Sequence, residues 1–195
     1  MRLFVALDID DPIRERIARF LDGVRDFAPD VHWVRPESLH VTLKFIGEFP
    51  DESAEKMKQV LATVAGGGIE VVFCGSGFFP TARSARVFWI GIEAGPQLAI
   101  LAKAVDEATA TLGIAREDRA FSPHLTLARG GGGSGSPRQP AGDRANRAFQ
   151  KLQEKLAAMP APEFGTMIAH EFFLYRSELG RGGPRYTKIA RFPLA

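Results

Sequence analysis

The sequence predicts an α+β fold in which antiparallel sheets are covered by helices. Three observations support this class. Short β-prone runs are followed by longer runs in which apolar residues recur with helical spacing. The order of strand, helix, strands, helix and strand recurs in rough form in the second half of the chain. One similar His-containing strand occurs in each half, which indicates an internal duplication with one copy in each lobe.

The first half of the chain alternates strands with helices. Strands are predicted at residues 3–9, 31–34, 39–46, 69–73 and 87–92, and helices at residues 10–24, 52–64 and 96–112. Asp10, Asp11 and Pro12 mark the start of the first helix, because acids and proline are favoured in a first helical turn. Gly66 to Gly68 and Gly113 are the expected stops of the other two helices.

The second half continues with a strand at residues 121–128, a helix at 145–159, and closing strands at 166–175 and 186–192. Between them, residues 130–143 consist of glycine, serine, proline and polar residues with a single alanine. Such a segment has no apolar anchor, so we expect a flexible loop there. Residues 1–195 are otherwise expected to form one domain of two lobes.

The bulk composition indicates an ordinary globular protein. Hydrophobic residues make up 45% of its 195 residues, charged residues make up 25%, and the net charge is only +2. The small charge excludes a polycationic nucleic-acid coat, so any polyanion would bind at a local patch. Cys74 is the one cysteine, which excludes an intrachain disulfide. The N-terminal run lacks the features of a signal peptide. We expect a cytoplasmic monomer of a single domain, without a transmembrane span.

Two short segments carry the chemistry. Residues 39–43 read LHVTL and residues 123–127 read PHLTL, so each has a histidine followed two residues later by a threonine. Side chains alternate faces along a strand, so each His/Thr pair should share one face. The same alternation predicts Lys44 on the face of His40 and Thr42, with Leu39, Val41, Leu43 and Phe45 in the core.

Two imidazoles and two hydroxyls suit the cleavage of a phosphodiester. Imidazoles titrate near neutral pH, so one can accept a proton from water while the other donates one to the departing oxygen. The threonine hydroxyls can donate hydrogen bonds to phosphate oxygens as charge develops. His32 and His170 have no threonine two residues later, and we expect packing or surface roles for them. The sequence has no Cys/His cluster with zinc spacing, so neither a metal nor a cofactor is expected.

The chain resembles the two-histidine phosphoesterase superfamily around these motifs. Residues 33–47, WVRPESLHVTLKFIG, and residues 121–129, FSPHLTLAR, are similar to its two motif blocks, and residues 2–7 and 173–186 to its first strand and closing hairpin. Within it, the resemblance is to the RNA 2′,3′-cyclic phosphodiesterases of the LigT/ThpR type, first described as 2′-5′ RNA ligases. Residues 130–143 depart from the family pattern, since this loop is longer and consists mostly of glycine, serine, proline and polar residues. It could leave the cleft open or act as a lid.

The resemblance implies two αβ lobes around a central cleft and metal-free hydrolysis of a 2′,3′-cyclic phosphate to a 2′-phosphate. It implies that Thr42 and Thr126 hold the phosphate and that Arg129 binds it or stacks on the base. It also implies that His124 activates the attacking water and that His40 protonates the leaving 3′-oxygen.

Several alternatives remain open on the sequence alone. Phe4 could belong to the core or line the cleft, and Lys44 could contact substrate or form a rim salt bridge. The same site could join RNA ends through a 2′-5′ linkage, with a ribose hydroxyl in place of water. A non-catalytic nucleotide- or RNA-binding module is a third possibility, although pure binding does not need a matched acid and base.

Overall fold

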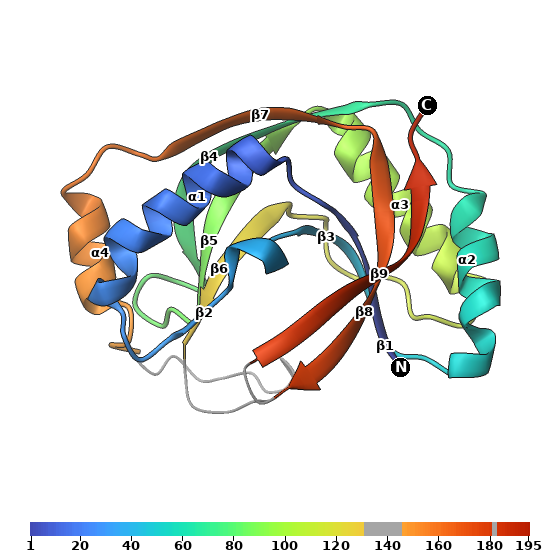
Figure 1. Cartoon of the computed structure of the whole chain (residues 1–195), viewed down its shortest axis with the longest axis horizontal. Helices are drawn as coiled ribbons and strands as arrows, with labels where there is room; N and C mark the ends of the chain where they lie inside the picture. Colours follow the sequence, from blue (N-terminus) through green and yellow to red (C-terminus); the bar gives the residue numbers. More distant parts are fainter. Residues whose placement is uncertain (131–145, 181–182) are drawn as a thin grey trace.

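The computed structural model describes residues 1–130, 146–180 and 183–195 (Figure 1). Its strands are β1 (Arg2–Leu7), β2 (His32–Trp33), β3 (Val41–Glu48), β4 (Ile69–Phe79), β5 (Val87–Ala94), β6 (His124–Arg129), β7 (Glu163–Ala169), β8 (Glu171–Gly180) and β9 (Gly183–Pro193). Its helices are α1 (Asp11–Val24), α2 (Ala54–Ala62), α3 (Pro96–Ala110) and α4 (Gln150–Ala157), with short 3₁₀ helices η1 (Arg25–Phe27), η2 (Pro36–Ser38) and η3 (Asp51–Ser53).

The strands form two antiparallel sheets. The first has the order β3-β1-β8-β9, and the second has the order β2-β6-β5-β4-β7. The two copies of the His/Thr motif are divided between them, because β3 belongs to the first sheet and β6 to the second. This arrangement confirms the predicted α+β class with antiparallel sheets.

Helices α1 and α3 each follow a strand of one sheet but pack against the other sheet. Helix α1 follows β1 of the first sheet but packs against β7 of the second, whereas α3 follows β5 of the second sheet and packs against β3 of the first. Four apolar side chains at helical spacing form the buried face of α1: Ile13, Ile17, Leu21 and Val24. The exchange ties the two sheets together across the molecule.

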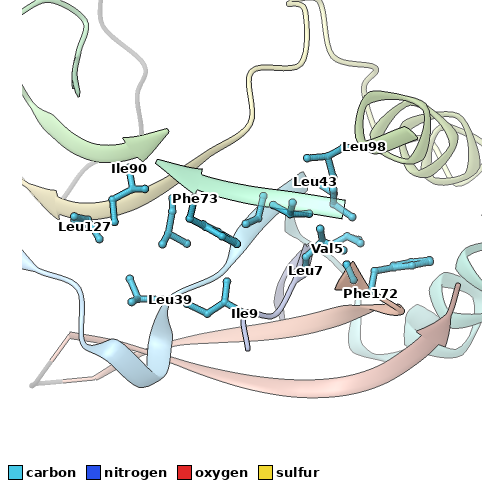
Figure 2. Close-up of a cluster of buried hydrophobic side chains, with 14 of the residues drawn as sticks. Val5, Leu7, Ile9, Leu39, Leu43, Phe73, Ile90, Leu98, Leu127 and Phe172 are labelled. Carbon is cyan, nitrogen blue, oxygen red and sulfur yellow. The ribbon is translucent and has the colours of Figure 1, made fainter. Parts of the chain in front are cut away.

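One continuous hydrophobic core joins the sheets. Val5 and Leu7 of β1 belong to the same buried cluster as Phe73 of β4, Ile90 of β5 and Leu127 of β6 (Figure 2). Because each buried side chain of this size is stabilised by about 1.5–3 kcal/mol of transfer free energy, the cluster holds the sheets in a fixed relation. The strands that carry the motifs are therefore anchored on a shared core.

The closing strands differ from the prediction. Residues 166–175 were expected to form one strand, but the chain changes sheet at His170, so that β7 completes the second sheet and β8 enters the first. Both segments are β-prone, so the sequence gives no signal at this crossover. The expected flexible loop at residues 130–143 lies, apart from Gly130, outside the described residues. No helix in the described part is long and apolar enough to cross a membrane.

Candidate active site

The two motifs lie close together although they belong to different sheets. His40 directly precedes β3, and His124 is the first residue of β6. These two strands contact each other across the junction between the sheets. The fold therefore brings together the two strands that carry the motifs.

Both imidazoles are oriented by the same local contact. The Nδ1 atom of His40 lies 2.8 Å from the carbonyl oxygen of Ser38, and that of His124 lies 2.9 Å from the carbonyl oxygen of Ser122. A carbonyl only accepts, so Nδ1 carries the proton in each ring and Nε2 is left for a substrate. The common pattern Ser-x-His-x-Thr was visible in the sequence, although the backbone carbonyl rather than the serine hydroxyl makes the contact.

Each motif is followed by a β-bulge at the same position. In β3, Thr42 and Lys44 pair with the consecutive residues Ala6 and Val5, so Leu43 is the extra residue. In β6, Thr126 and Ala128 pair with Trp89 and Phe88, so Leu127 is the extra residue. A bulge shifts the alternation of side chains by one position.

The bulges change which residues accompany the histidines. Lys44 and Ala128 turn into the core, while Phe45 and Arg129, each five residues after a histidine, return to its face. Phe45 is 49% exposed and stacks against Phe4, which pairs with it across β1 and β3. The expectation that Phe45 belongs to the core is therefore wrong, and simple alternation could not have revealed it.

Lys44 does not line the cleft. Its side chain is only 2% exposed, and Nζ donates to Asp106 Oδ1 at 2.6 Å and to the carbonyl of Ala115 at 2.6 Å. It also lies 3.2 Å from Glu117 Oε1. The expectation that Lys44 shares the face of His40 is wrong because the bulge at Leu43 reverses its direction. Lys44 instead links β3 to α3 and to the segment that leads into the second motif.

Phe4 lies beneath the His40 ring. It is 1% exposed, and its centroid lies 4.7 Å from that of His40 and 4.9 Å from that of the stacked Tyr175 ring. Tyr186 meets the His40 ring edge-on at 5.1 Å. Phe4 thus forms part of a small buried cluster on the His40 face of the sheet, separate from the main core. By contrast, His124 has a single aromatic neighbour among the described residues, Phe79, at 5.2 Å.

The surroundings of His40 alter its proton affinity. Burial is the largest cause that lowers the pKa of His40 below its ordinary value of 6.5, and the Ser38 carbonyl opposes this effect. The Arg129 guanidinium, from the other sheet, lowers the pKa further. Arg129 thus acts on the charge of His40 although the two residues belong to different sheets.

An ion-pair network supports the segment before His40. Burial alone would raise the pKa of Asp8, but its hydrogen bond and charge interaction with Lys188, together with the Arg14 guanidinium, hold that pKa below 3.8. Arg14 lies 2.6 Å from Asp8 Oδ1 and also donates to the carbonyl of Pro36 at 2.6 Å. Arg14 thereby fixes η2, which contains the Ser38 carbonyl that orients His40.

The sequence comparison decides the family. The family model described as LigT like Phosphoesterase matches residues 7–89 and again residues 90–186, so each match contains one His/Thr motif. The chain belongs to the LigT-like phosphoesterase family. This membership confirms the resemblance inferred from the motif blocks.

Relatives in this family match the chain along its whole length. The RNA 2′,3′-cyclic phosphodiesterase of Methanothermobacter thermautotrophicus is 33% identical over 196 residues, which cover 100% of this chain and 99% of the relative. The enzyme of the same name from Archaeoglobus fulgidus is 33% identical over 192 residues, covering 98% of this chain and 99% of that one. Among solved structures, E. coli LigT complexed with 3′-AMP is similar with a TM-score of 0.76 and 28% identity, covering 99% of this chain and 97% of that one.

The remaining histidines lie outside this LigT-like site. His32 and His170 are exposed, as expected for surface histidines. Among residues 1–130, 146–180 and 183–195, no group of three potential ligands is placed to hold a metal ion.

Proposed function

We propose that this protein hydrolyses RNA or nucleoside 2′,3′-cyclic phosphate ends to 2′-phosphates, with His40 and His124 as the acid–base pair. The supporting observation is the matched pair of imidazoles, each held through Nδ1 by a carbonyl and each placed at the start of a bulged strand. Relatives that match along the full length carry the name RNA 2′,3′-cyclic phosphodiesterase.

The proposed reaction is an in-line displacement at phosphorus. His124 Nε2 accepts a proton from water as the water oxygen forms a bond to phosphorus. The bond from phosphorus to the ribose 3′-oxygen breaks, and His40 Nε2 donates its proton to that oxygen. Thr42, Thr126 and Arg129 would bind the phosphate oxygens, whose negative charge increases in the transition state. Proton balance is kept, since one imidazole gains the proton that the other loses.

The lowered pKa of His40 bears on this order. In the free protein it favours neutral His40, which suits a base rather than an acid. A bound phosphodiester carries a negative charge that stabilises the imidazolium and so raises the pKa. We therefore keep His40 as the acid in the substrate complex, where its protonation is coupled to substrate binding.

A base-stacking surface accompanies the phosphate site. Phe45 is half exposed on the His40 face, and the Arg2 guanidinium lies 5.6 Å from its ring centroid. Aromatic side chains stack on any nucleobase, typically contributing about 1–3 kcal/mol for each base. Phe45 is thus the side chain in the first half best placed to stack on the base of the substrate.

Product analysis tests the proposal. Adenosine 2′,3′-cyclic phosphate should give adenosine 2′-phosphate, and either His40→Ala or His124→Ala should lower the rate ~10²–10⁴-fold, the usual contribution of a general acid or base. EDTA should have no effect. Absence of hydrolysis by the wild-type protein would contradict the proposal, and joined product in the presence of 5′-hydroxyl RNA would indicate the 2′-5′ ligase reaction instead.

We also infer that the protein acts as a monomer in the cytoplasm, because both motifs come from one chain and RNA ends are its expected partners. Sedimentation and cell fractionation test these two points, and an obligate dimer would contradict the first.

A further inference from the structure

Asp8 lies at the centre of a side-chain network around His40. It directly follows β1, and its two carboxylate oxygens have different partners. Arg14 of α1 donates to Oδ1 at 2.6 Å, and Lys188 of β9 forms an ion pair with Oδ2. The backbone amide of Ile9 also donates to Oδ1, at 2.9 Å. One carboxylate therefore ties a helix and a strand, which are far apart in the sequence, to the end of β1.

The first arm of this network leads to the Nδ1 side of the His40 ring. The guanidinium of Arg14 donates to Asp8 through one nitrogen and to the carbonyl of Pro36 through another, each at 2.6 Å. Pro36 begins η2 and Ser38 ends it, and the carbonyl of Ser38 accepts the Nδ1 proton of His40. A planar guanidinium holds two acceptors in fixed directions at once, whereas an ammonium is a single charge on a flexible stem.

The second arm leads to the aromatic wall of His40. Lys188 lies on β9 two residues after Tyr186, whose ring meets that of His40 edge-on at 5.1 Å. The Lys188 ammonium also lies 4.0 Å from the ring centroid of Phe173, so two groups fix its position. The ion pair with Asp8 thus holds β9 at the point where Tyr186 contacts the imidazole.

The orienting segment of His124 is supported differently. Ser122 is exposed, and within the part of the chain that the structure describes no ion pair involves residues 118–123. The two imidazoles therefore have the same local contact, but only the segment before His40 is linked through it to an ion-pair network. Loss of that network should be felt at His40 and not at His124.

We propose that Asp8 is a positioning residue for the general acid: through Arg14 and Lys188 it holds the His40 imidazole so that Nε2 meets the leaving 3′-oxygen. Asp8 acts through other residues, because the Nδ1 atom of His40 is already bound to the carbonyl of Ser38. The inference rests on the proposed function, in which His40 is the acid. Correct placement of a reacting group is a large part of its catalytic effect, so a residue remote from the chemistry can control the rate.

Charge supports the same role. Burial is the largest cause that lowers the pKa of His40, and the guanidinium groups of Arg129 and Arg14 add to it, while the Ser38 carbonyl and the Asp8 carboxylate raise the pKa. Asp8 therefore favours the protonated imidazole that a general acid requires.

The test compares two substrates in four proteins. Adenosine 2′,3′-cyclic phosphate requires a proton on its leaving oxygen, whereas a nitrophenyl phosphodiester expels its leaving group without one. The proteins are the wild type, Asp8→Asn, Arg14→Lys and Asp11→Asn. Arg14→Lys keeps the positive charge but loses the fork that reaches both Asp8 and Pro36. Asp11→Asn is the matched control, because it removes an exposed carboxylate at the start of the same helix, 3.9 Å from Arg14.

We expect Asp8→Asn to lower kcat for the cyclic phosphate by up to about 100-fold, as a displacement of about 1 Å at the reacting atoms can. KM should change little, because the proposed phosphate-binding side chains are untouched. The rate with the nitrophenyl ester should stay close to that of the wild type, because that reaction needs no acid. Arg14→Lys should show the same selective loss to a smaller extent, and Asp11→Asn should match the wild type with both substrates.

NMR of the imidazole nitrogens gives a second measurement that needs no turnover. In the wild type, neutral His40 should have its proton on Nδ1, as the Ser38 carbonyl requires. In Asp8→Asn and Arg14→Lys, the tautomer with the proton on Nε2 should also be populated at His40. His124 is the internal control, and its unchanged signals would show that each variant is folded.

Three results would overturn the proposal. One is an Asp8→Asn protein with the wild-type kcat for the cyclic phosphate, and another is an equal loss with both substrates, which a general structural defect would give. The third is an unchanged His40 tautomer in both variants of the network. If Asp8→Asn does not fold, Arg14→Lys decides by the same criteria. A wild-type protein that hydrolyses neither substrate fails the proposed function, while the NMR measurement still decides whether Asp8 orients His40.

Discussion

The two histidine motifs share their local geometry but differ in their surroundings. Each imidazole is held through Nδ1 by the carbonyl two residues before it, and each strand has a bulge directly after its threonine. Around His40, however, Phe4, Tyr175 and Tyr186 form an aromatic wall, whereas His124 lies against Phe79. The short motif therefore fixes the orientation of each ring, and at His40 the surrounding residues bury the imidazole, which lowers its pKa.

The residues at equivalent positions after the bulges also differ. Lys44 and Ala128 both turn into the interior, and Phe45 and Arg129 both return to the histidine face. One half thus presents an aromatic ring and the other a guanidinium. Two copies of one strand geometry thus provide different chemical groups on the two sides of the proposed phosphate site.

The largest expected effect separates the roles of the two histidines. A nitrophenyl phosphodiester has a leaving group that departs without protonation, so it needs a base but not an acid. We expect His40→Ala to lower the rate of hydrolysis of adenosine 2′,3′-cyclic phosphate ~10²–10⁴-fold. The rate with the nitrophenyl ester should fall much less, because that reaction needs no acid. His124→Ala should strongly lower the rate of hydrolysis of both substrates, because both reactions need the base. Steady-state kinetics with both substrates measures this, and the reverse pattern would exchange the two roles.

A second prediction concerns Lys44 and its buried partners. Lys44→Met should lower the free energy of unfolding by about 3 kcal/mol, because it leaves Asp106 without its cation in a mostly buried place. Lys58→Met is the control, since Lys58 forms only a surface pair with Glu55 and should change stability by less than about 1 kcal/mol. Urea denaturation gives both values. Equal stability losses in the two variants would show that the Lys44 cluster has no special structural role.

A third prediction uses the pH dependence of stability. His40 has a lowered pKa in the folded protein, so at pH values above 6.5 it is neutral in both states. As the pH falls below 6.5, the unfolded chain takes up the proton first, and stability declines until the pH passes below the pKa of folded His40. Denaturation at a series of pH values should therefore show a shallower decline in His40→Asn. Identical curves for the two proteins would mean that His40 is not desolvated.

The smallest effect is a change of proton affinity transmitted between the sheets. Arg129→Ala should raise the pKa of His40, because the guanidinium is one of the groups that lower it. Titration of the imidazole by proton NMR measures this shift. Arg83→Ala removes an exposed arginine that is not one of the groups acting on His40, so it should leave the pKa of His40 unchanged. An equal pKa of His40 in the wild type and in Arg129→Ala would show that Arg129 does not act on His40.

Much of this arrangement could be predicted from sequence because it depends on local pattern. The two His-x-Thr segments, the helical face of α1 and the alternation of strands and helices along the chain all follow from residue spacing. The bulges could not be predicted, because they are set by pairing with β1 and β5. Simple alternation therefore predicts the wrong faces for Lys44 and Phe45. The change of sheet at His170 also depends on tertiary pairing. That residues 1–195 form one bilobal domain stays a prediction.

The central claim is that both imidazoles bind one phosphate, and a crystal structure of the protein with adenosine 2′-phosphate tests it most directly. We predict that the phosphate lies between the motifs, with the Nε2 atoms of His40 and His124 both at hydrogen-bonding distance from its oxygens. A phosphate that contacts only one of the two histidines, or that binds elsewhere, would contradict the account.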